Sequence, residues 1–251
     1  MAGRKLIDTA RSRAFRTLWM LEEIGIPYQH VAALPQSEQA RRYNPLGKIP
    51  VLVEDDGFSL YESGAILSYL GDRYRSNSGG GLVPRAGTRE RAIYEQTMSV
   101  LLTELDAQGL WIHRKHEVMG KFFTYVPDAV EHARKYFHKT NRVLIQQLKD
   151  NNNNSNKNKN KNNQSNNDNT NGLDRGGGES SSFLLGSGFS AVDIVYVQCL
   201  DWSKDIGWND KWKDNDALAS YVAACKSRAA YARTLAVAKN EGKHDRSGSK
   251  L

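Results

Sequence analysis

The spacing of apolar residues divides the 251-residue chain into two parts. As far as residue 76, short β-type runs alternate with helical patterns, and beyond residue 88 only helical patterns follow. The first run, Lys5–Asp8, predicts a strand. A helical pattern that Ser12 can cap and Gly25 can end comes next, followed by a second strand, Tyr28–Ala32.

A hairpin is predicted further along this first part. The β-type runs Ile49–Glu54 and Phe58–Tyr61 flank Asp55-Asp56-Gly57, a sequence that suits a tight turn. Pro50 lies at the start of the first run, where its missing N–H is tolerated. The Ile49–Pro50 bond is a candidate cis peptide.

Glu62 and Ser63 separate the hairpin from the helical pattern GAILSYLGDRY, so Ser63 is predicted to be the N-cap of that helix. The N-terminus of a helix beside exposed strand backbone suits a small anionic peptide as ligand. With a polar helical segment between Pro35 and Asn44, the element order is β-α-β-α-β-β-α. This order predicts a compact α/β domain built on a parallel βαβ unit and an antiparallel hairpin.

The second part is predicted to be all-α. Residues 77–88 have the composition of a linker, so we expect an α/β domain over residues 1–76 and an all-α domain over residues 89–240. Ser190 and Asp193 form a reciprocal capping pattern in front of an apolar, central helix. The expected helices are Arg89–Met119, Val130–Leu148 started at Asp128, Ile194–Leu200, Ala217–Ser227 and Ala230–Ala238.

An Asn-rich run, NNNNSNKNKNKNNQSNNDNTN, interrupts these helical patterns. It cannot bury apolar surface, so residues 150–182 are expected to be a disordered insertion on the surface. A tolerated expansion in a loop explains its composition without a binding role. Residues 241–251 are expected to form a polar tail.

Charge and cysteine content change this picture little. The net charge is +7, but six basic residues lie in the insertion and the tail, and the body without them is near neutral. Neither nucleic-acid nor membrane binding is therefore predicted, and no apolar run approaches the roughly 20 residues of a membrane span. Cys199 and Cys225 are too few for a disulfide framework or a zinc site and fit a reducing compartment. The six basic residues are Lys157, Lys159, Lys161, Lys243, Arg246 and Lys250.

The last three residues, Ser249-Lys250-Leu251, match the peroxisomal address that an import receptor reads at a free C-terminus. We therefore expect a peroxisomal location, with the cytoplasm as the alternative. The N-terminal residues lack the apolar core of a secretory signal.

Several stretches in chain order carry a family resemblance. They are SRAFRTLWMLEEIGIPY, NPLGKIPVL, YESGAILSYLGDRY, YEQTMSVLLTELDAQGLW and FSAVDI. As an ordered set they resemble the soluble, cytosolic-type glutathione transferases, over most of the chain outside the insertion and the tail. The resemblance implies a thioredoxin-like N-terminal domain followed by an all-helical domain. It also implies a homodimer, with glutathione as co-substrate and no other cofactor.

The resemblance gives roles to the residues around the hairpin. Ser63 and the first N–H groups of its helix would hold the γ-glutamyl carboxylate of glutathione, and Glu62 its ammonium group. Ile49, turned toward the pocket by a cis bond to Pro50, would pair with the cysteinyl unit, and Lys48 would meet the glycine carboxylate. Taken singly, Ser63 could be a plain helix cap and Pro50 a structural turn.

The reacting thiol needs activation, because the thiolate is the nucleophile. A hydroxyl group beside the sulfur at a helix N-terminus favours the charged form. Ser12 is the candidate catalytic residue, which indicates a serine-type member. Thr9 or a backbone amide near Ser12 could activate the thiol instead. Ser12 could also be a helix cap without a catalytic role. In some classes the activating residue aligns nearer Arg11. A cysteine-type member would have a cysteine near position 12, and this chain has none there. Tyr28 is too late in the chain to be an activating tyrosine.

The second substrate is expected to bind between the domains. Trp111, Leu102 and Met98 are possible walls of that site, although core packing explains them equally well. His113 and His116 are three residues apart without an evident third ligand, so a solvated helix face is preferred to a metal site.

The function predicted from the sequence is transfer of glutathione to small apolar electrophiles, or reduction of organic hydroperoxides with glutathione. The alternative from another class is a non-catalytic ligand carrier or interaction module, because this fold also serves non-enzymes. A glutathione-dependent isomerase or dehalogenase is a narrower option.

Overall fold

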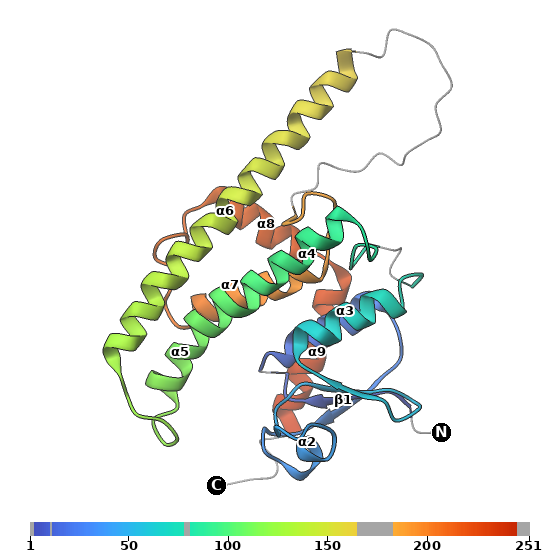
Figure 1. Ribbon diagram of the computed structural model, residues 1–251, viewed down its shortest axis with the longest axis vertical. Coiled ribbons are helices and arrows are strands. Elements are labelled where there is room, and N and C mark those ends of the chain that lie inside the picture. The colour runs from blue at the N-terminus through green and yellow to red at the C-terminus, as the bar shows by residue number, and fades with distance from the viewer. Residues whose placement is uncertain (1–2, 11, 78–80, 165–182, 245–251) are drawn as a thin grey trace.

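The computed structural model describes residues 3–10, 12–77, 81–164 and 183–244. These residues form an α/β domain and an all-α domain, the fold class predicted from the sequence (Figure 1). Residues 165–182 of the insertion and the tripeptide Ser249-Lys250-Leu251 lie outside the described part of the chain, so the expectations placed on them stay predictions. Within the described part, no helix is long and apolar enough to cross a membrane.

The α/β domain is built on a four-stranded sheet in the order β2-β1-β3-β4. The central strand β1 (Lys5–Asp8) pairs in parallel with β2 (Gln29–Ala32) and antiparallel with β3 (Val51–Val53). β4 (Ser59–Tyr61) completes the predicted antiparallel hairpin. Hence the parallel βαβ unit and the hairpin are both confirmed. β3 begins after Pro50, which has no N–H to give to the ladder.

Three helices cover this sheet: α1 (Ala14–Ile24), α2 (Glu38–Tyr43) and α3 (Ser63–Arg73). α1 ends where predicted, because Gly25 adopts a left-handed conformation with a φ of 72° and donates its N–H to Leu21 O. α1 and α3 pack against each other and bury their apolar faces in the main core of the molecule.

The all-α domain starts with a continuous helical rod from residue 89 to residue 118. Its middle and its end have π-type turns, whereas the sequence predicted one helix over Arg89–Met119 without such turns. The last helix of the chain, α9, returns to pack against α1 of the first domain (Figure 1). The elements are α4 (Arg89–Ser99), η1 (Val100–Leu110), α5 (Trp111–His113), η2 (Arg114–Val118), α6 (Pro127–Gln164), α7 (Ala191–Asp205), α8 (Asp216–Lys226) and α9 (Ala229–His244).

The prediction of an unstructured insertion from residue 150 is wrong for residues 150–164. α6 runs to Gln164 and projects beyond the body of the domain (Figure 1). No proline or glycine lies between Asp150 and Gln164, so each added residue extends a helix that is already nucleated. The first turn of this extension is tied down, because Asn151 Nδ2 donates to Leu184 O at 2.9 Å.

The predicted capping pattern in front of α7 is confirmed and lies in the core. Asp193 Oδ2 accepts from the backbone N–H of Ser190 at 2.8 Å, and Asp193 Oδ1 accepts from Leu184 N and Tyr221 Oη, each at 2.9 Å. This carboxyl group has no exposed surface, and burial raises its pKa to about 6. Asp193 thereby joins the start of α7 to the chain after the insertion and to α8.

Replacing Asp193 with alanine is expected to lower the free energy of unfolding by at least about 2 kcal/mol, since it leaves buried backbone donors without acceptors. Urea denaturation at neutral pH measures this loss. Asp216→Ala, at an exposed first-turn position of α8, is the control and should change stability by less than about 0.5 kcal/mol. Equal midpoints for wild type and Asp193→Ala would contradict the assigned role.

Candidate active site

The strand register brings the predicted site segments together at one end of the sheet. Val51 on β3 lies opposite Ile7 on β1 and opposite Tyr61 on β4. Both pairings are antiparallel, so the residues that follow Ile7 and Tyr61 leave the sheet at the end where Pro50 enters it. The turn containing Ser12, the Ile49–Pro50 segment and the start of α3 therefore converge.

The loop before β3 is stabilised by hydrogen bonds of the Asn44 side chain to the backbone of the same loop. Asn44 is buried, donates from Nδ2 to Lys48 O at 2.9 Å, and accepts at Oδ1 from Leu46 N at 3.0 Å. The Ile49–Pro50 peptide bond is cis, as predicted. Pro50 is buried, Ile49 is half-buried and Lys48 is exposed, so Ile49 and Lys48 are accessible at the surface of this loop.

The predicted N-cap at Ser63 is wrong by one residue. Ser63 is the first residue of α3, and Glu62 is the cap. The chain turns from β4 into the helix at Glu62 alone, which adopts a φ of 71°, a region that residues other than glycine rarely occupy. Backbone strain of this kind is concentrated at functional sites.

The start of α3 leaves donors available. The Glu62 side chain makes no capping hydrogen bond and is exposed, whereas Ser63 is only 5% exposed. The first N–H groups of a helix have no partner within the helix. Glu62, Ser63 and these N–H groups therefore form a small site with an exposed carboxylate beside backbone donors.

Ser12 lies in a turn rather than at the N-cap position predicted for it. Arg13 is the cap residue of α1, and the Ser12 hydroxyl donates to Thr9 O at 2.8 Å while accepting from Ala14 N at 3.1 Å. A hydroxyl hydrogen can rotate to another acceptor while its oxygen stays in place. Thr9 is half-buried in the same turn, and Arg11 is outside the described residues.

A buried ion-pair cluster behind this turn was not predicted. Arg13 binds Asp106 in a bidentate manner, with Nε to Oδ2 at 2.8 Å and Nη2 to Oδ1 at 2.5 Å. Arg16 Nη2 donates to Asp106 Oδ2 at 2.6 Å. Burial by itself would raise the pKa of Asp106, but the two guanidinium groups together lower it below its ordinary value. The cluster joins α1 to η1, and hence one domain to the other.

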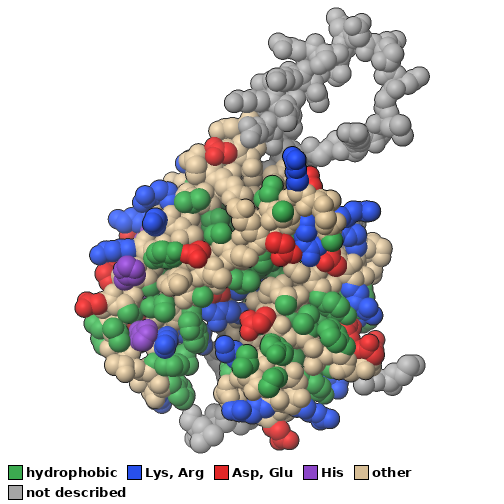
Figure 2. Space-filling view, viewed as in Figure 1, with side chains coloured by type: hydrophobic (Ala, Val, Ile, Leu, Met, Phe, Trp, Pro, Cys, Tyr) green, Lys and Arg blue, Asp and Glu red, His purple; other side chains and the backbone are tan. Residues whose placement is uncertain are grey.

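The possible walls of the second-substrate site lie next to these residues. Arg13 Cζ is 5.1 Å from the ring centroid of Trp111 and 5.5 Å from that of Trp202. Leu102 and Met98 lie against the first turn of α3, since a Cβ added at Gly64 would be 2.6 Å from Leu102 Cδ1 and 3.8 Å from Met98 Cγ. A hollow opens between parts of the two domains in the space-filling view (Figure 2).

The solvated face predicted for His113 and His116 is wrong for His113. Its side chain is buried against Trp208, with ring centroids 5.2 Å apart, and burial lowers its pKa. His116 Nδ1 lies 2.8 Å from Thr124 O. Within the described part of the chain, no group of three or more histidine, cysteine, aspartate or glutamate residues could hold a metal ion.

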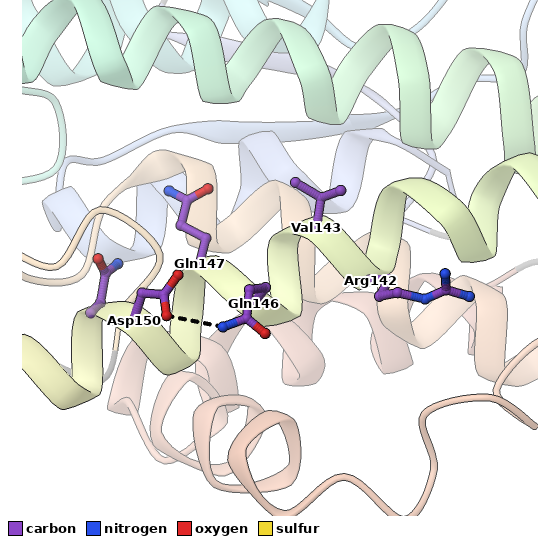
Figure 3. A pocket seen from close by; sticks show the side chains of 6 residues that line it. Arg142, Val143, Gln146, Gln147 and Asp150 are labelled. Carbon is purple, nitrogen blue, oxygen red and sulfur yellow. Dashed lines mark hydrogen bonds between the residues drawn. The ribbon is translucent and has the colours of Figure 1, made fainter.

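A second hollow, of about 480 Å³, lies on α6 and is separate from the candidate site (Figure 3). Across it, Gln146 Nε2 donates to Asp150 Oδ1 at 3.0 Å. It is shallow and carries no cluster of reactive groups. The residues lining it are Arg142, Val143, Gln146, Gln147, Asp150 and Asn151.

The contribution of the Asp106 cluster to the stability of the fold is expected to depend on pH. Because the pKa of Asp106 is lower in the folded than in the unfolded protein, its contribution is present above about pH 4 and is lost as the pH falls through the folded value. Asp106→Asn should be less stable than wild type at pH 7, by about 3–5 kcal/mol, because the buried Arg16 and the half-buried Arg13 lose their shared counter-ion. The difference should narrow below about pH 4.

Urea denaturation at pH 7 and at a value below about pH 4 tests this expectation. Asp205→Asn, which removes an exposed carboxylate near the end of α7, is the matched control and should behave like wild type at both. A stability difference between Asp106→Asn and wild type that does not change with pH would contradict the charged role of Asp106.

Sequence comparisons point to one family. A profile described as "Glutathione S-transferase, N-terminal domain" matches residues 11–73. Glutathione S-transferase hmp2 of Hypomyces subiculosus is 31% identical over 155 residues, which cover 57% of this chain and 71% of that protein. The matched profile spans the turn at Ser12, the cis-proline segment and the start of α3.

Solved structures show the same fold. Ure2p5 from Phanerochaete chrysosporium, cocrystallized with 1-(S-glutathionyl)-2,4-dinitrobenzene, superposes with a TM-score of 0.71 at 16% identity, covering 100% of this chain and 99% of its own. Ure2p in complex with glutathione gives a TM-score of 0.72 at 16% identity, covering 92% and 97%. At 16% sequence identity these similarities establish the fold, a thioredoxin-like domain followed by a helical domain. They do not establish the reaction.

Proposed function

The chain belongs to the glutathione S-transferase family, and from that premise we propose that it transfers glutathione to small apolar electrophiles. The observation that carries this proposal is the convergence, at one end of the sheet, of the Ser12 turn, the Ile49–Pro50 segment and Glu62–Ser63. Glutathione is the co-substrate, and the donor set there suits its two carboxylates and ammonium group.

In the proposed complex the γ-glutamyl unit lies at the start of α3. The uncapped N–H groups and Ser63 hold its carboxylate, and the exposed Glu62 pairs with its ammonium group. The half-buried Ile49 offers its backbone to the cysteinyl unit, as an added strand would pair with a sheet edge. The exposed Lys48 is available for the glycine carboxylate.

Glu62→Ala and Ser63→Ala are each expected to weaken glutathione binding by about 10-fold or more, since hydrogen bonds to charged groups contribute about 1.5–3 kcal/mol. Retention on immobilised glutathione and calorimetric titration measure the effect. Glu95→Ala, which removes an exposed carboxylate on α4, serves as the control. Normal retention of both site variants would remove Glu62 and Ser63 from the binding site.

We propose that the Ser12 hydroxyl activates the thiol, which makes the protein a serine-type member. In the reaction the thiolate attacks the electrophilic carbon, a C–S bond forms, the bond to the leaving group breaks with its electron pair, and the thiol proton passes to solvent. A hydrogen bond from Ser12 would favour the thiolate before this step. To donate it, the hydroxyl must turn away from Thr9 O, its acceptor in the structure.

Ser12→Ala is therefore expected to lower turnover at least about tenfold while leaving the affinity for glutathione nearly unchanged. Steady-state kinetics at saturating glutathione, with a separate binding titration, resolve the two quantities. Thr9→Val is the companion variant, because it removes the other hydroxyl of the same turn. Unchanged turnover in Ser12→Ala would exclude Ser12 from the mechanism, and a loss confined to Thr9→Val would transfer the role to Thr9.

The proposal as a whole is tested by assaying the purified protein with glutathione and an activated aryl halide, and in parallel with an organic hydroperoxide. Conjugation of the halide is the expected result, and reduction of the hydroperoxide would add a peroxidase activity. Glutathione binding without turnover of either would favour the second candidate, a non-catalytic ligand carrier. The engagement of the Ser12 hydroxyl by Thr9 O is the observation that favours it.

We also propose a homodimer, as the family implies. The exposed apolar side chains of Phe58, on the hairpin, and Ile93, on α4, are available for such a contact.

A further inference from the structure

Exposed apolar side chains are concentrated at a tip of the helical domain, in the segment between η2 and α6 (Figure 1). Residues 119–126 of this segment are here called the aromatic loop. Phe122 is 76% exposed and Tyr125 is 61% exposed. With the residue directly before it, the loop supplies four of the nine large apolar side chains that are exposed in the described part of the chain, which makes it a cluster rather than an isolated exposure. The four are Val118, Phe122, Phe123 and Tyr125.

The aromatic loop keeps its shape through hydrogen bonds of its own. The backbone N–H groups of Phe122 and Phe123 donate to Met119 O at 2.9 and 3.0 Å. His116 Nδ1, on η2, lies 2.8 Å from Thr124 O. The rings are therefore exposed on a formed backbone, so a partner that covers them does not have to order the loop first.

The region that carries the aromatic loop is basic, although the chain without its insertion and tail is near neutral. Residues 114–149 contain eight lysines and arginines against three acids, and residues 132–149 contain no acid. Lys135, Lys139 and Arg142 are exposed and recur at four- and three-residue steps, so they lie on one face of α6. Figure 2 shows basic side chains along the outer edge of α6. The expectation that the protein binds no membrane was drawn from total charge, which averages over this local excess.

Basic groups also lie beside the rings themselves. Lys115 Nζ is 5.2 Å from the ring centroid of Phe123, and the exposed Lys121 lies within the aromatic loop. One of the acids is paired, since Glu131 Oε1 is 3.5 Å from Lys135 Nζ. The side of the domain that presents the rings therefore carries a positive charge. The three acids of the region are Glu117, Asp128 and Glu131.

A lipid surface with anionic headgroups matches this combination of groups. Aromatic rings prefer the headgroup level of a bilayer, and lysine and arginine are attracted to anionic lipids. Single-stranded nucleic acid also binds aromatic rings and basic groups, but it does so along a basic groove in which its bases stack. The aromatic loop instead projects at a tip of the domain, which favours the lipid surface (Figure 1).

We propose that the aromatic loop and the basic face of α6 bind the surface of an anionic membrane. Phe122, Phe123 and Tyr125 enter the headgroup layer, while the basic face of α6 contacts the anionic headgroups. The binding is peripheral, since no helix among the described residues could span a membrane. This surface is separate from the candidate glutathione site. Where the proposed function holds, it brings the enzyme to the lipid phase, in which apolar electrophiles accumulate.

Sedimentation of the purified full-length protein with lipid vesicles tests the proposal. One set of vesicles consists of phosphatidylcholine alone, and the other contains phosphatidylserine as well. The expected result is binding at least about tenfold tighter to the vesicles that contain phosphatidylserine. Raised salt should weaken this binding, because salt screens the attraction between exposed charges.

Two pairs of matched variants separate the rings from the charge. Phe122→Ser should weaken vesicle binding at least about tenfold, whereas Leu34→Ser, at a position 70% exposed on the other domain, should not. Lys139→Glu should weaken it by about tenfold, whereas Lys239→Glu, an identical charge change at an exposed position on α9, should leave it unchanged. Circular dichroism establishes that each variant is folded.

A wild-type protein that sediments with neither kind of vesicle, or equally with both, would overturn the proposal. Equal losses in each variant and its control would do so as well. A loss in Lys139→Glu without one in Phe122→Ser would remove the aromatic loop from the contact and reduce it to charge attraction. Tight binding of a single-stranded oligonucleotide by a protein that ignores both kinds of vesicle would assign this surface to nucleic acid instead.

Discussion

The ion pairs of Asp106 with Arg13 and Arg16 join the two domains at the place where the candidate site forms. The carboxylate comes from the middle of η1 and is shared by Arg13 and Arg16 at the start of α1, so it ties the helical domain to the α/β domain. All three groups must be satisfied together, because removing one partner of a buried ion pair leaves a charge without compensation. Together with the packing of α7 and α9 on α1, this contact holds the Ser12 turn against the second domain.

The second constraint is the register of the sheet. Pairing of Val51 with both Ile7 and Tyr61 forces three chain segments to one end of the domain. There the chain must turn from β4 into α3 within one residue, and Glu62 adopts a left-handed conformation to do so. That turn leaves the Glu62 carboxylate exposed and the first N–H groups of α3 uncapped by it. A site suited to a peptide with charged ends is therefore a consequence of how hairpin and helix are joined.

Local features of this fold could be predicted from the sequence, and features that depend on distant contacts could not. The hairpin, the cis bond before Pro50 and the capping pattern of Asp193 depend on neighbouring residues, and the structure confirms each. The N-cap at Ser63 was misplaced because strand pairing decides where α3 begins. A charged residue among the apolar positions of η1 was a sequence signal for the Asp106 cluster. Its arginine partners lie about 90 residues away in sequence, so the local pattern could not identify them. The Asn-rich composition led to a wrong prediction of disorder for residues 150–164, where α6 continues as a helix.

Binding of glutathione at the start of α3 is the central claim, and calorimetric titration of the wild-type protein with glutathione and with cysteinylglycine tests it most directly. Cysteinylglycine keeps the thiol and the glycine carboxylate but lacks the γ-glutamyl unit that Glu62, Ser63 and the helix N-terminus are proposed to hold. We predict measurable binding of glutathione and a loss of affinity of at least about 100-fold for cysteinylglycine, since more than one charged hydrogen bond is removed. Equal affinity for the two ligands would contradict the site.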